Sequence, residues 1–177
     1  MAKVAIGVSI SLDGFIAGPG DGPELPLGGR GGEHIFDWYF GDDKPYKGTM
    51  FKPKGTNRRA VAEMFDQAGV MLTGRRTYEI ANGWNGTHPV NSIPIVVLTH
   101  DPPRNPPRGK SKLVFVTDGI ESAVAEAKAL VFSGPAAGPF HQGRLSRRWR
   151  MVHSNRNRCQ QVHRTGLPVD VDTLVRF

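Results

Sequence analysis

The sequence has almost no cysteine and no long apolar run. Its one cysteine, Cys159, cannot form a disulfide within the chain or supply a cysteine-cluster zinc site. No apolar run approaches the roughly 18 residues that a membrane helix needs, so we expect no membrane partner. The apolar residues 4–8 are too few for the core of a signal peptide and lead into Asp13-Gly14 rather than a cleavage site. These absences predict a cytoplasmic protein.

Lysine and glutamate are missing from the last quarter of the chain. Residues 131–177 hold eight arginines against two acids and carry +6 of the net charge of +7, whereas residues 1–130 are almost balanced. A basic chain suggests nucleic-acid binding, and an arginine-rich binding tail is one alternative. The tail contains few aromatic residues and no RNA-binding module, however, and the main body has no charge excess. We therefore expect no nucleic-acid partner.

Strand and helix patterns alternate along the first three quarters of the chain. Runs rich in valine and isoleucine predict buried strands at residues 3–11, 70–73, 94–100 and 112–117. Apolar spacing predicts helices at residues 57–68, 75–81 and 120–130. Asn57 is the predicted N-cap of the first helix, and residues 131–134 read as a short strand entering a glycine turn. This alternation favours an α/β fold with a largely parallel sheet.

A phosphate-binding pattern stands at the end of the second predicted strand. Thr73-Gly74 closes the strand, and Arg75, Arg76 and Thr77 open the next helix. Glycine allows close approach of the backbone, a helix start offers free N–H groups, and arginine adds a fork of charged donors. An ordinary strand–turn–helix with surface arginines explains the pattern equally well.

Two further segments leave alternatives open. Asp13-Gly14 is first a turn signal, although α/β proteins also place ligand-handling groups where a strand ends. The aromatic run at residues 33–40, with His34 and Trp38, is either a short helix over a pocket or a packing patch under a long loop. The histidines do not follow the spacing of metal ligands, so we expect no metal site.

These motifs together resemble the RibD C-terminal domain family, which shares the dihydrofolate reductase fold. The resemblance covers about residues 3–130. Its motifs are Val8–Gly18 (VSISLDGFIAG), Thr73–Glu79 (TGRRTYE), Pro94–His100 (PIVVLTH) and Phe115–Ala123 (FVTDGIESA). It implies a three-layer fold with a mixed, mostly parallel central sheet flanked by helices. It also implies an NADPH-dependent reductase that transfers hydride to a pterin- or pyrimidine-like small molecule, as in riboflavin biosynthesis.

The resemblance also implies roles for individual residues. Asp13 would orient the substrate or relay a proton, and His34 and Trp38 are alternative candidates for contact with the substrate. The remaining residues would contact the cofactor: Ile16 and Ala17 over the nicotinamide, Thr73, Gly74, Arg75, Arg76 and Thr77 at the phosphates, and Leu98, Thr99 and His100 near the adenosine 2′-phosphate.

The end of the chain departs from this family. A Gly-Gly pair is expected to meet the cofactor pyrophosphate, but here only Gly134 is found, followed by Pro135, which has no N–H to donate. We therefore divide the chain into an incomplete reductase domain, residues 1–134, and an atypical tail, residues 135–177, which has the composition of a shifted reading frame. Loss of the closing strands would leave a non-catalytic nucleotide-binding remnant as the alternative function. Family members form homodimers, but the altered region contributes to that contact, which argues against a dimer here.

Overall fold

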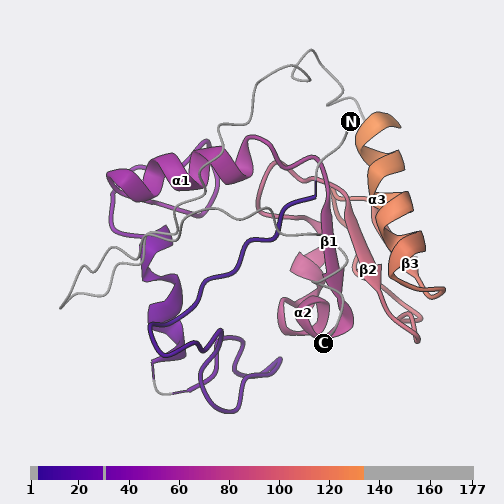
Figure 1. The fold of residues 1–177 in the computed structure, drawn as a ribbon, viewed down its shortest axis with the longest axis horizontal. Coiled ribbons are helices and arrows are strands. Elements are labelled where there is room, and N and C mark those ends of the chain that lie inside the picture. Colours follow the sequence, from indigo (N-terminus) through magenta and orange to yellow (C-terminus); the bar gives the residue numbers. More distant parts are fainter. Residues whose placement is uncertain (1–3, 30, 134–177) are drawn as a thin grey trace, which may run out of the picture.

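Three short parallel strands form the centre of the fold. The computed structural model describes residues 4–29 and 31–133. In it, β1 (Met71–Gly74), β2 (Ile95–Leu98) and β3 (Leu113–Val116) form a sheet in the order β1-β2-β3. The register sets Gly74 opposite Leu98 and Leu98 opposite Val116, so the three carboxyl ends lie at one edge of the sheet (Figure 1). The predicted α/β class, with a parallel sheet, is confirmed.

Helices cover both faces of this sheet (Figure 1). Val96 of β2 packs against Ala127 in α3 (Ile120–Ser133) on one face. Ile95 and Val97 point to the other face, where they meet Tyr78 of α2 (Arg75–Ile80). Successive strand residues point to opposite faces, and β2 is therefore buried on both sides. This burial on both faces explains why residues 94–98 are apolar without alternation.

A second apolar cluster lies under the loops outside the sheet. It joins α1 (Thr56–Phe65) to η1 (Gly32–Tyr39), a short 3-10 helix. The Tyr39 ring lies 5.0 Å from the Phe51 ring and 6.1 Å from the Phe65 ring, measured between centroids. A further 3-10 segment, η2 (Asn82–Gly86), follows α2. The run at residues 33–40 thus forms a short helix, as one alternative has it, and its Trp38 and Tyr39 pack into an apolar cluster, as the other has it.

The predicted first strand is wrong. Residues 4–10 form neither helix nor strand, and Val4 and Ile6 are 64% and 70% exposed. A strand needs a neighbour for its backbone N–H and C=O groups, and within the described residues no strand pairs with this segment. It is held instead by a side-chain contact, in which Trp38 Nε1 donates to Ser9 Oγ at 2.9 Å.

Two boundaries also differ from prediction. Asn57 lies inside α1, which begins at Thr56 with Gly55 as its N-cap residue. Residues 131–133 of the expected short strand belong instead to α3, which continues through Ser133. The Val131 side chain lies beside Gly69, where an added Cβ atom would be only 3.3 Å from it.

Several predictions concern residues outside the described part of the chain. They include Gly134, Cys159 and the whole of residues 135–177. Within the described residues, no helix is both long and apolar enough to cross a membrane.

Candidate functional site

The carboxyl edge of the sheet is the candidate site, because the predicted phosphate-binding motif lies there. Gly74 ends β1 and Arg75 begins α2 with no intervening residue. Gly74 is exposed, and a Cβ atom built on it would meet no other atom within 4 Å. The space beside the Gly74 backbone is therefore open to a ligand. Thr73 is partly buried and Thr77 is exposed.

Arg75 is bound to acidic side chains of the protein. Its Nε donates to Glu79 Oε1 at 2.6 Å, and its Nη1 donates to the Asp101 carbonyl and lies 3.4 Å from the Asp101 carboxylate. The Glu79 hydrogen bond is the main cause of the raised pKa of Arg75. These contacts tie the start of α2 to the segment that leaves β2.

Arg76 is the more accessible arginine. Its side chain is 70% exposed, and its Nη2 donates to Asp21 Oδ1 at 2.8 Å and to the Asp21 carbonyl at 3.0 Å. Asp21 belongs to a glycine- and proline-rich loop far from α2 in the sequence. An exposed pair of this kind contributes little to stability. Its geometry nevertheless shows that an oxyanion fits against the Arg76 guanidinium.

The residues after β2 reach the same edge. Leu98 is paired with Gly74, and the Thr99 N–H donates to the Val116 carbonyl at 3.0 Å. Thr99 is 5% exposed, and its hydroxyl accepts from the Asp101 N–H at 3.2 Å. His100 is exposed. The Thr99 hydroxyl thus shapes the turn, and His100 is the side chain of this pair that a ligand can reach.

Asp13 lies in an exposed turn. Ser11 Oγ donates to Asp13 Oδ1 at 2.5 Å and accepts from the Phe15 N–H at 2.8 Å. Ile16, two residues beyond Gly14, is 61% exposed, and Ala17 is partly buried. No hydrogen bond or ion pair within the described ranges joins Asp13 to the sheet edge. The turn interpretation is confirmed, and the substrate role stays a prediction.

His34 and Trp38 lie in a different region. The His34 side chain is 71% exposed, and its Nδ1 is 3.0 Å from Asp37 Oδ2, one turn along η1. The Trp38 ring packs on Tyr39 with centroids 3.8 Å apart. Trp38 therefore belongs to the aromatic cluster around α1, whereas His34 lies exposed on η1, and no described contact brings either residue to the carboxyl edge.

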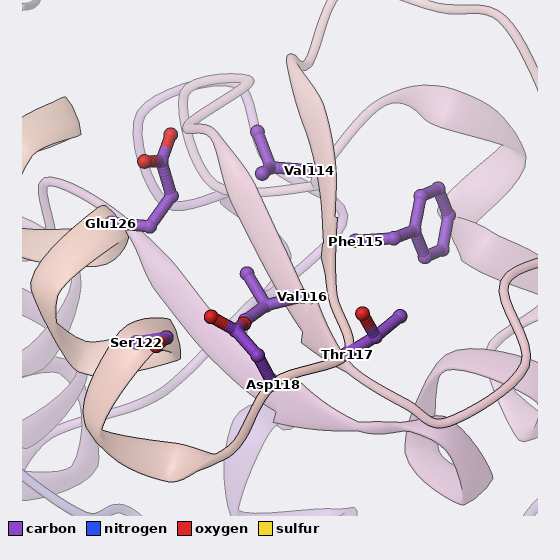
Figure 2. Close-up of a pocket in the computed structure, with 7 residues that line it drawn as sticks. All are labelled: Val114, Phe115, Val116, Thr117, Asp118, Ser122 and Glu126. Carbon is purple, nitrogen blue, oxygen red and sulfur yellow. The ribbon is translucent and has the colours of Figure 1, made fainter.

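A pocket at β3 was not foreseen from the sequence. It has a volume of about 380 Å³ and lies where β3 ends and α3 begins, with Thr117, Asp118 and Glu126 in its lining. Figure 2 shows Glu126 and Ser122 on one side of β3, with Phe115 pointing to the other. Thr117-Asp118-Gly119 and Thr99-His100 each follow a strand, and Thr73-Gly74 ends one; this shared position at a strand end was the available signal.

The described residues contain no group of three or more His, Cys, Asp or Glu side chains that would hold a metal ion. In comparison with known proteins, the chain matches no family model and no curated protein.

Proposed function

We propose that the chain is an NADPH-dependent reductase of the RibD C-terminal type, acting on a pterin- or pyrimidine-like small molecule. The observation that carries the proposal is the parallel register of β1 and β2, which brings the Thr73–Thr77 motif and His100 to one edge of the sheet. Open α/β sheets bind nucleotides at this edge.

The residues at the edge fit the phosphates of NADPH. The open space beside Gly74 admits a phosphate close to the backbone, and Arg76 already binds the carboxylate of Asp21. In this proposal Arg76 exchanges that carboxylate for a cofactor phosphate. Arg75 fixes the start of α2 through Glu79 and Asp101. When bound, NADPH supplies the hydride that reduces the heterocycle.

On the substrate side, the proposal assigns the proton-handling role to Asp13 and places Ile16 and Ala17 over the nicotinamide. His34 and Trp38 are alternative candidates for contact with the substrate. Asp13 is exposed and accepts a hydrogen bond from Ser11, so its carboxylate is oriented and can accept or relay a proton. Gly134, which the proposal assigns to the pyrophosphate, lies beyond the described residues.

A non-catalytic nucleotide-binding protein is the second candidate. The observation in its favour is the separation of the proposed substrate residues, because Trp38 packs in the α1 cluster and His34 lies exposed on η1. Catalysis requires reacting groups to be held close together. In this reading, the carboxyl edge retains a nucleotide and hydride transfer is lost.

A turnover assay separates the two candidates. The chain is mixed with NADPH and a panel of pterins, ribosylaminopyrimidines and small carbonyl compounds, and loss of nicotinamide absorbance is followed. A reductase oxidises NADPH with at least one of them, and Asp13→Asn slows it about a hundredfold. Glu24→Gln, which removes an exposed carboxylate of the following loop, is the matched control. NADPH binding without turnover of any compound would contradict the reductase and support the second candidate.

A further inference from the structure

A second pocket lies in the connection between β2 and β3. Its volume is about 510 Å³, and its lining consists of residues 104–109 with Ser111 and Leu113. Leu113 is the first residue of β3, so the pocket extends toward the amino end of the sheet, away from the carboxyl edge. Small-molecule pockets commonly have volumes of roughly 300–1,000 Å³, and this one falls in that range.

The pocket is positively charged and contains no acidic side chain. Arg104 and Arg108 belong to its lining, and Lys110 and Lys112 follow along the same loop. None of the ion pairs within the described residues involves these four cations. Arg75 and Arg76, by contrast, each face a carboxylate. The two pocket arginines therefore keep their donors for a ligand.

The loop around the pocket is held by close backbone packing. A Cβ atom built on Gly109 would lie 2.3 Å from the Gly86 carbonyl oxygen, so only glycine fits there. The Ser111 N–H donates to the Gly86 carbonyl at 3.0 Å, and the Lys110 N–H donates to Thr87 Oγ1 at 3.0 Å. Adjacent prolines further restrict the backbone. A cationic site that is already ordered loses less entropy when it binds a ligand.

The loop also packs close to η2. A Cβ atom built on Gly83 of η2 would lie 2.9 Å from Pro107 Cγ and 2.9 Å from the Tyr78 ring. The loop is thus packed onto the α2 layer of the fold. The sequence repeats Pro-Pro-Arg at residues 102–104 and 106–108, which places the two arginines four residues apart on this restrained backbone.

We propose that this pocket binds a phosphate monoester dianion through Arg104 and Arg108. Guanidinium groups match phosphate oxygens as paired donors, and the Asn105 amide adds a neutral donor in the same lining. The site is separate from the carboxyl edge and does not depend on the proposed reductase function. Free phosphate and the phosphate of a nucleotide offer the same chemistry to it.

Calorimetric titration of the full chain with inorganic phosphate, and separately with AMP, tests this site. The double variant Arg104→Gln/Arg108→Gln should weaken phosphate binding by about tenfold or more, because hydrogen bonds from charged donors are lost. Phosphate should also shift the backbone amide NMR signals of Asn105 and Gly109. Tighter binding of AMP identifies a nucleotide as the source, and equal binding identifies the phosphate group alone; both support the site.

The control removes the same charge elsewhere. Lys54→Gln/Arg59→Gln changes exposed cations at and near α1 and should leave phosphate binding within about twofold of the unmodified chain. Arg76→Ala should also retain it. Equal weakening in the control, loss of binding in Arg76→Ala alone, or no phosphate binding by the unmodified chain would overturn the proposal.

Discussion

His88 is a residue through which the stability of this fold depends on pH. Its ring lies 5.6 Å from the Trp84 ring, measured between centroids, and its Nδ1 is 3.1 Å from the Val90 N–H nitrogen. Burial lowers the pKa of His88 below its usual 6.5, and the Val90 carbonyl, 3.3 Å from Nδ1, only partly opposes this. The unfolded chain therefore takes up the proton at a higher pH than the folded chain does.

Acidification should consequently destabilise the protein. As pH falls below about 6.5, the unfolded state gains a proton first, so the free energy of unfolding decreases until the pKa of the folded state is passed. Between about pH 7 and pH 5 the loss is at most about 2 kcal/mol, because one proton contributes about 1.4 kcal/mol per pH unit. Chemical denaturation at the two pH values measures it.

His88→Asn isolates this effect, since the amide oxygen can accept from the Val90 N–H but does not titrate. The pH-dependent loss should shrink in that variant. His100→Asn, which removes an exposed imidazole, should leave it unchanged. If His88→Asn and the unmodified chain lose equal stability on acidification, His88 is not the cause.

The sequence identified the residue types of the candidate site but not their partners. Arg75 and Arg76 were placed at the start of a helix, and the structure has them there. Besides Glu79, one turn along α2, the carboxylates that they contact are those of Asp101 and Asp21, which lie 26 and 55 residues away. Contacts over such separations depend on how loops return to the sheet, and no local pattern around residue 21 encodes that path.

At the scale of elements, β2 is the strand on which the fold depends most. Ile95, Val96 and Val97 are all 0% exposed, and β2 pairs on both sides, with β1 and with β3. Within the described residues, β1 and β3 each pair with a strand on one side only. Burial of these side chains against α2 and α3 joins the three layers.

Truncation of β2 should therefore be costly. Ile95→Ala removes buried methyl groups and leaves a cavity, so we expect the free energy of unfolding to fall by about 2–5 kcal/mol. Denaturant titration measures the change. Ile16→Ala is the matched control, because Ile16 is 61% exposed and its truncation should change stability by no more than about 0.5 kcal/mol. Similar losses in both variants would contradict the central position of β2.

Elements with strong local signals were predicted, and those that depend on distant partners were not. The strands within residues 70–117 and the helix α3 follow from valine-rich runs and apolar spacing. Residues 4–10 have the same valine-rich character and form no strand. A pattern shows that a segment suits a strand, whereas pairing requires a neighbouring strand elsewhere in the chain.

The molecule as a whole combines a three-layer unit with a separate loop-covered cluster. The sheet, α2 and α3 form the first, while α1 and η1 form the second. The residues proposed to contact the cofactor phosphates belong to the first unit, and His34 and Trp38 lie on η1 in the second. The sequence motifs suggested one continuous site. Spacing along the chain does not show which of the apolar clusters a loop packs against, and the separation of the two units could therefore not be predicted.

Cofactor binding at the carboxyl edge is the central claim, and a titration of the full chain with NADPH tests it most directly. Nicotinamide fluorescence and the melting temperature are followed for the unmodified chain, Arg76→Ala and the control Arg59→Ala. We predict that NADPH raises the melting temperature of the unmodified chain. Arg76→Ala should weaken NADPH binding about tenfold, and Arg59→Ala should leave it unchanged. Absence of any NADPH effect on the unmodified chain, or equal binding by all three proteins, would contradict the claim.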